Sequence, residues 1–154
     1  MSKKCWLVIG LLLLVIIAGA YKFMIQGSVS ESADGRMAIH LHTGERDLIL
    51  EEMRAFLTSV QKITQGISAN DMALVAEYAK KAGKAAQGEV PGTLIGKLPV
   101  AFKKLGFDTH SKFDQIALDA ESFGDSSHAL EQLSTLMQNC VACHAGHRIE
   151  VSAK

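Results

Sequence analysis

Apolar residues recur at helical spacing along most of the chain after residue 42. The first such stretch, residues 43–67, has apolar side chains four and three residues apart, at Ile49, Met53, Phe56, Val60, Ile63 and Ile67. The second, residues 71–87, has an inner face of small residues. The third begins at Asp108 or Thr109 and ends at Gly124. The fourth begins near Asp125 and has one stripe made of Leu130, Leu133, Met137, Cys140, His144 and His147. These spacings are typical of amphipathic helices.

The connections between these stretches are mostly short, which predicts an all-α fold, an antiparallel four-helix bundle. Residues 89–99 contain both prolines and predict a loop. Residues 100–105 predict a separate helical turn that Gly106 ends. His40 and His42 alternate with Ile39 and Leu41 in a short strand-like or extended pattern, but no segment shows a convincing β-hairpin signal.

The N-terminal segment is different in character. Lys3 and Lys4 precede an uncharged apolar run, residues 5–21, and apolar residues continue to Ile25. A signal peptide has a basic start, an apolar stretch and a small-residue cleavage site, which residues 18–20 fit. A membrane anchor needs about 17–25 apolar residues, which the longer run supplies. We therefore expect residues 1–26 to be a signal peptide or membrane anchor, residues 27–42 a spacer, and residues 43–154 the bundle.

Both interpretations of the N-terminus place the rest of the chain across the membrane, because basic residues favour the cytoplasmic side. We expect a location in the periplasm, possibly with an anchor in the inner membrane. The 154 residues carry 16 basic and 16 acidic side chains, so their net charge is zero. A nucleic-acid-binding protein would normally carry a basic surplus, so no nucleic-acid partner is expected. No set of nucleophile, base and orienting residue is visible, and no enzymatic activity is predicted.

The motif Cys140-Val141-Ala142-Cys143-His144 carries the clearest chemistry in the sequence. The pattern C-x-x-C-H is that of c-type haem attachment. Residues i, i+3 and i+4 lie on one helix face, so two thiols can each form a thioether while the imidazole reaches the iron. A zinc site would need more paired Cys or His, and a thioredoxin-like dithiol belongs beside a βαβ pattern. We therefore expect one covalently attached haem c per chain.

A four-helix bundle with this motif in its last helix resembles the class II cytochromes c, the cytochrome c′ group. The resemblance covers residues 43–149. It implies that His144 is an axial iron ligand and that Arg148, which matches the family's arginine after the motif, lies beside the haem. His147 stands where the family has Tyr or Phe. The family also contains dimers formed through the first two helices, so a homodimer is compatible with the small inner face of residues 71–87.

The second axial position of the iron has two candidates in the first helix. The family's distal residue follows an arginine by four positions, and Leu50 follows Arg46 at that spacing. Met53 lies on the same face, and its thioether can bind iron. With Met53 as ligand, the protein would carry single electrons between redox partner proteins. With Leu50 over an open iron, it would bind nitric oxide or carbon monoxide. We choose Met53, and hence electron transfer.

Overall fold

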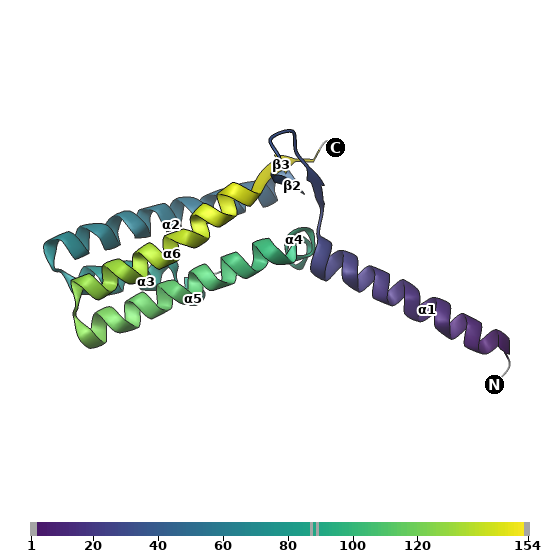
Figure 1. Cartoon of the computed structure of the whole chain (residues 1–154), viewed down its shortest axis with the longest axis horizontal. Helices are drawn as coiled ribbons and strands as arrows, with labels where there is room; N and C mark the ends of the chain where they lie inside the picture. Colours follow the sequence, from purple (N-terminus) through teal and green to yellow (C-terminus); the bar gives the residue numbers. More distant parts are fainter. Residues whose placement is uncertain (1–2, 87, 89, 153–154) are drawn as a thin grey trace.

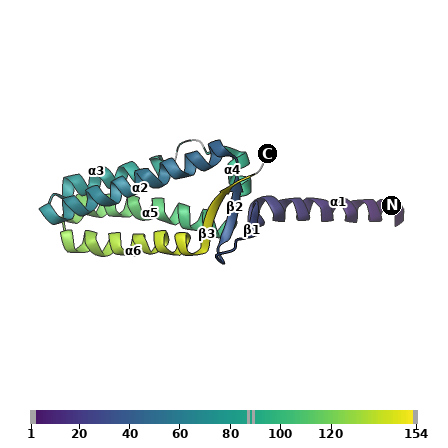
Figure 2. The same cartoon turned by 90° about the horizontal axis from the view of Figure 1, so that it is seen from above.

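The computed structural model describes residues 3–86, 88 and 90–152, and these are mostly helical (Figure 1). The elements are α1 (Lys3–Tyr21), the π-helical turn η1 (Lys22–Gln26), β1 (Val29–Glu31), β2 (Met37–Leu41), α2 (Thr43–Ala69), α3 (Met72–Ala82), the 3-10 turn η2 (Lys84–Ala86), α4 (Gly92–Lys97), α5 (Val100–Phe123), α6 (Ser126–Gly146) and β3 (His147–Val151). Helices α2, α3, α5 and α6 lie side by side in both views (Figure 2).

The N-terminal helix extends away from the packed helices (Figure 1). Together α1 and η1 cover 24 residues, Lys3–Gln26, and none of their apolar side chains is buried in the structure. A membrane-spanning helix needs about 20 predominantly apolar residues. This helix is therefore long and apolar enough to cross a membrane, as the sequence predicts, and a signal sequence has the same properties.

A tight joint connects this helix to the rest of the chain. Gly27 has a φ of 71°, and a Cβ atom there would lie 2.4 Å from the carbonyl oxygen of Lys97. Only glycine fits such a conformation at such a close approach. The backbone N–H of Ser28 donates to the same Lys97 oxygen at 2.7 Å. The Phe23 ring packs directly on Gly96 of α4.

The ends of the long helices follow from local chemistry. The Asp71 side chain accepts a hydrogen bond from Leu74 N at the start of α3, and Asp125 caps the first amides of α6 in the same way. Asn70 ends α2 and Gly124 ends α5, both in the left-handed conformation that terminates helices. These are the polar and glycine breaks that the sequence predicts.

One apolar core lies between α2, α3, α5 and α6. Its buried residues are Ile63, Val75, Ala76, Ala79, Ala82, Phe113, Ile116, Ala117, Ala120, Ala129, Leu133 and Leu136. The alanines of α3 let it approach its neighbours closely, and at Gly66 of α2 an added Cβ would lie 2.8 Å from the Val75 side chain. The face of small side chains predicted for α3 therefore packs against α2.

Two predicted helix boundaries are wrong. Gly106 does not stop a helix, because α5 continues through it from Val100 to Phe123. A helical glycine costs about 1 kcal/mol relative to alanine, which burial of Phe113 and the residues after it outweighs. Helix α3 ends at Ala82, and the predicted end at Gln87 lies outside the described residues. The predicted loop, whose first residue Glu89 is also outside them, contains the short helix α4.

Three strands are also present, which corrects the expectation of a chain without hairpins. Within the predicted spacer, β1 pairs antiparallel with β2, and β2 pairs in parallel with β3. Ile39 and Leu41 are completely buried, and the burial of these apolar side chains stabilises the strands. His147 therefore lies in β3 and not on the helical stripe of α6. The strand β3 was not expected, because its partner β2 is more than a hundred residues away in the sequence.

Truncation of the central aromatic residue tests the core. Phe113→Ala should lower the free energy of unfolding by about 3–5 kcal/mol, because it opens a cavity among completely buried side chains. Phe123→Ala is the matched control in the same helix, since that ring is 70% exposed and its loss should cost less than about 1 kcal/mol. Urea unfolding of the full chain in detergent, followed by circular dichroism, measures both. Equal losses would contradict this account of the core.

Candidate functional site

The C-x-x-C-H motif lies beside a cavity of about 230 Å³. The cavity is bounded by the last turn of α6, by β3, by the first half of α2 and by Phe102 of α5. Its lining consists of Arg36, Arg46, Leu50, Met53, Phe102, Cys143, His144, His147, Arg148 and Ile149. The structure therefore brings together five of the six predicted site residues, Leu50, Met53, Cys143, His144 and Arg148, while Cys140 lies outside the lining.

The two cysteines of the motif have different surroundings. Cys143 lines the cavity, whereas Cys140, one turn earlier, packs against the main core. Neither forms a disulfide, and burial raises the pKa of both thiols. Both are therefore held as thiols rather than thiolates at neutral pH. His144 is exposed at the end of α6 and reaches the cavity with its side chain.

Two candidate distal residues share one wall of the cavity. Leu50 and Met53 lie on neighbouring positions of one face of α2, and both are partly buried. Met53 also packs against the smaller apolar cluster of Ile39, Leu41, Ile49, Leu94 and Leu98. The structure places both side chains opposite the motif, so the choice between them stays a prediction.

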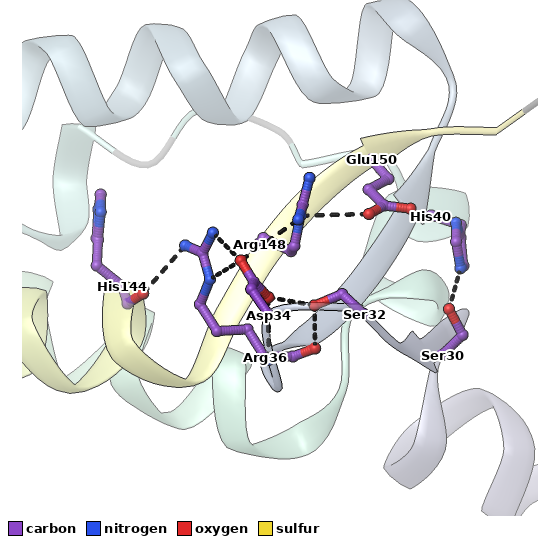
Figure 3. A network of polar contacts seen from close by, with 8 residues as sticks. All are labelled: Ser30, Ser32, Asp34, Arg36, His40, His144, Arg148 and Glu150. Carbon is purple, nitrogen blue, oxygen red and sulfur yellow. Dashed lines mark hydrogen bonds and ion pairs between the residues drawn. The ribbon is translucent and has the colours of Figure 1, made fainter.

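A charged network holds the motif against the β-hairpin (Figure 3). The Arg36 guanidinium donates to Asp34 Oδ2 through Nη2 at 2.6 Å and through Nε at 2.9 Å. It also donates to the backbone oxygen of His144 at 3.4 Å, so one arginine links the hairpin to the end of α6. In Figure 3 the His144 ring points away from its own backbone oxygen, so the contact with Arg36 does not involve the imidazole.

Arg148 belongs to the same network. Its Nη1 lies 3.3 Å from Asp34 Oδ2, and its Nε lies 3.2 Å from Glu150 Oε1. The register of the sheet sets this arrangement, because Arg148 pairs with Ala38 between the two strands. Its side chain is 38% exposed and lines the cavity, and its guanidinium is already paired with these two carboxylates.

His147 presents a polar atom without a partner. Its ring stands edge-on to Phe102, with centroids 5.6 Å apart, and its Nδ1 is buried without a hydrogen-bond partner. A buried nitrogen without a hydrogen-bond partner has lost its hydrogen bonds to water, which costs desolvation free energy. Because His147 also lines the cavity, this atom is suited to a hydrogen bond with a bound group.

The lining offers part of the chemistry that a haem attached through the motif would use. It supplies one thiol, an exposed imidazole, an unpartnered nitrogen and an apolar surface from α2, whereas the second thiol, Cys140, packs against the core. The cavity is smaller than the roughly 300–1,000 Å³ usual for ligand pockets, so a larger group would remain partly at the surface. Among the described residues, no cluster of three or more His, Cys, Asp or Glu side chains could hold a metal ion alone.

Arg36 and Asp34 are the site residues that the sequence did not reveal. They lie in the segment expected to be a spacer, and nothing in their immediate neighbourhood indicates a contact with residues 144–148. The signal that was available is the short alternation at Ala38, Ile39, His40 and Leu41, which is typical of a strand. His40 itself bonds to the Ser30 hydroxyl at 2.7 Å and takes no part in the cavity.

Comparison of the chain with protein-family models, with curated proteins and with solved structures finds no match. The resemblance to class II cytochromes c thus rests on the motif and on the helical pattern alone.

The charged network should weaken in acid. Two Arg36 hydrogen bonds are the main reason that the pKa of Asp34 lies well below its usual range, and the Ser32 hydroxyl adds to the effect. A carboxyl with a lowered folded-state pKa stabilises the fold above its unfolded pKa of about 4, and this contribution disappears as the pH falls toward the folded value. Asp34→Asn should therefore lower the urea midpoint at pH 7, and the difference from wild type should shrink below about pH 4.

The neighbouring acidic residue provides a control for this experiment. Glu31→Gln changes an exposed carboxylate of β1 that is not one of the partners of Asp34. It should leave the urea midpoint unchanged at both pH values. A constant difference between Asp34→Asn and wild type from pH 7 to pH 2 would show that the Asp34 charge does not hold the hairpin in place.

Proposed function

We propose that this protein is a monohaem c-type cytochrome that carries single electrons between redox partner proteins. In this proposal α2, α3, α5 and α6 form the antiparallel four-helix bundle, and one haem c is bound covalently through Cys140 and Cys143. The observation that supports it most is the shared cavity, which Cys143 and His144 of the C-x-x-C-H motif line together with Leu50 and Met53. A bound haem would supply a one-electron iron couple whose potential depends on its axial ligands.

The chain's own residues have distinct tasks in this proposal. His144 would supply a nitrogen ligand to the iron from the end of α6, and Met53 would supply a thioether ligand from α2. Arg148 would hold an acidic substituent of the haem in exchange for one of its contacts with Asp34 and Glu150. The apolar side of α2 keeps water away, which limits reorganisation when the charge of the site changes.

The proposed location is the periplasm, with the N-terminal helix retained as an anchor in the inner membrane. The length of the apolar run, which continues past Ala20 to Ile25, is what favours an anchor over a cleaved signal. Two contacts join the end of this run to the domain: Lys103 Nζ of α5 donates to the backbone oxygen of Met24 at 2.8 Å, and the Phe23 ring covers Gly96.

A second function is favoured by one observation, the presence of Leu50 in the same cavity wall. If Leu50 rather than Met53 covers the iron, the second axial position stays open. The protein would then bind nitric oxide or carbon monoxide, because an apolar residue leaves room for a diatomic molecule and offers no donor atom. Electron transfer remains our preferred function.

Removal of the motif thiols tests the covalent attachment. Each of Cys140→Ala and Cys143→Ala should weaken retention of haem on a denaturing gel stained for haem peroxidase activity, since each thiol would form one thioether. The double variant should show no stain. Cys5→Ala, which removes the cysteine of the N-terminal helix, is the matched control and should stain like wild type. Undiminished staining of the double variant would refute attachment at this motif.

A methionine replacement distinguishes the two functions. Absorption spectra of wild-type protein should show low-spin iron and weak binding of carbon monoxide, because the thioether closes the site. Met53→Ala should become high-spin and bind carbon monoxide readily. Met72→Ala, which shortens a methionine packed on the core away from the cavity, should keep the wild-type spectrum. High-spin wild-type iron that is insensitive to Met53→Ala would favour gas binding under Leu50.

A further inference from the structure

A second and larger cavity, of about 660 Å³, lies between α2, α4 and α5. This volume is within the roughly 300–1,000 Å³ that small-molecule sites occupy. Three aromatic rings contribute to its wall, Phe56, Phe102 and Phe107, and most of the remaining lining is aliphatic. The cavity therefore offers flat apolar surfaces to a ligand of moderate size, and no residue of the C-x-x-C-H motif belongs to it.

The cavity lies at the end of the domain next to the membrane-type helix. Ile95 of α4 and Lys103 of α5 line it, and the Lys103 ammonium joins this wall to η1, because it bonds the backbone oxygens of both Met24 and Ile95. Several large apolar side chains of the lining stay exposed: Leu48 by 49%, Val90 by 41%, Ile95 by 37% and Phe107 by 55%. Exposed apolar groups around a cavity mark a binding site, and their position favours a ligand that enters from the bilayer.

One polar pair is set into this apolar wall. His110 is only 2% exposed, and its Nδ1 lies 2.8 Å from the Ala82 carbonyl oxygen, so Nδ1 must carry a hydrogen. Its Nε2 lies 3.2 Å from Glu52 Oε1. An unprotonated Nε2 facing a carboxylate would bring two acceptors together, so one proton is shared between them. The Glu52 side chain is 42% exposed, and the pair can therefore be reached from the cavity.

The pKa of His110 agrees with this shared proton. Burial of the imidazole opposes the charged form, but the hydrogen bonds to Glu52 and Ala82 outweigh it and raise the pKa. A site that holds one exchangeable proton can donate a hydrogen bond to a carbonyl oxygen and can accept one from a hydroxyl group. It thus suits a ligand whose head group carries either of these.

The acidic and basic side chains of the lining are equal in number, and Lys81, Lys103 and Glu52 already have polar partners. Lys81 Nζ lies 2.6 Å from Glu77 Oε1, and Lys103 is bound to the two backbone oxygens described above. The lining contains two lysines and two glutamates besides His110. A charged head group would have to break these contacts, and so the balance favours a neutral ligand.

We propose that this cavity binds a lipid-soluble quinone or hydroquinone from the bilayer, with the ring between the phenylalanine side chains and its oxygen atoms at the Glu52–His110 pair. A quinone is neutral, flat, apolar in its tail, and alternates between carbonyl and hydroxyl oxygens, which matches each feature of the site. The proposal goes beyond the haem assignment and does not depend on it, because no motif residue lines this cavity.

The test uses the full chain in nanodiscs of phosphatidylcholine and a photoreactive azido-ubiquinone with a short tail. Mass spectrometry of the labelled peptides should locate the probe in residues 48–56 or 94–107. An excess of unlabelled decylubiquinone should abolish the labelling. Decylbenzene, which has a ring and a tail but no oxygen, and dioleoylglycerol, a neutral lipid without a ring, should not. Competition by decylbenzene or by dioleoylglycerol as strong as that by decylubiquinone would overturn the quinone assignment.

A variant that fills the cavity completes the test. Gly106 lines the cavity, and a Cβ atom there would meet nothing within 4 Å, so Gly106→Leu is compatible with the fold and favourable to the helix. It should reduce specific labelling at least about tenfold, equivalent to about 1.4 kcal/mol of binding free energy. Gly44→Leu is the matched control, since Gly44 is equally open but lies outside the lining. Unchanged labelling of Gly106→Leu, or labelling confined to α1, would overturn the proposal.

The double variant Cys140→Ala, Cys143→Ala separates this proposal from the haem assignment. Loss of haem staining with retained quinone labelling would support two independent sites. Loss of the labelling in a double variant that keeps the wild-type circular dichroism spectrum would overturn the independence that the separate linings indicate.

Discussion

The parallel pairing of β2 with β3 is the constraint on which the candidate site depends. It joins residues 37–41, which lead directly into α2, to residues 147–151, which continue directly from α6. Two helices whose sequences are far apart are therefore fixed at neighbouring ends, and the C-x-x-C-H motif faces the first half of α2. The apolar side chains of Ile39 and Leu41 are completely buried, and they make this pairing energetically worthwhile.

The sequence predicted the helices well and the strands poorly, for physical reasons. Helical periodicity and capping residues such as Asp125 are local, so they are visible in a short window of sequence, although the cap of α3 is Asp71 and not Asn70 or Ser68 as predicted. The strands are stabilised by a partner contributed from the other end of the chain, which no local pattern reveals. Gly106 shows the opposite error, because the local preference of glycine is overruled by burial of the residues that follow it. The motif could be read directly, whereas Arg36 and Asp34 could not, since their role exists only after the sheet has formed.

Phe102 gives the two cavities a common wall. It lines the small cavity beside Cys143 and the large cavity beside Glu52, and its ring also contacts His147 edge-on. The Ile49–Leu94–Leu98 cluster packs against the same side chain, so its position is fixed from several sides. The two proposed sites are thus adjacent without sharing their polar groups, which are the charged hairpin network on one side and the Glu52–His110 pair on the other.

The joint at Gly27 has a consequence for how the domain meets other molecules. The hydrogen bonds from Ser28 to Lys97 and from Lys103 to Met24 set the direction in which the helix leaves the domain. In a bilayer, such a joint would hold the domain at one height and with one face toward the surface. A partner in the same membrane would then search for this domain in two dimensions and in few relative orientations. Lateral diffusion in the bilayer would therefore set the rate at which the two proteins meet.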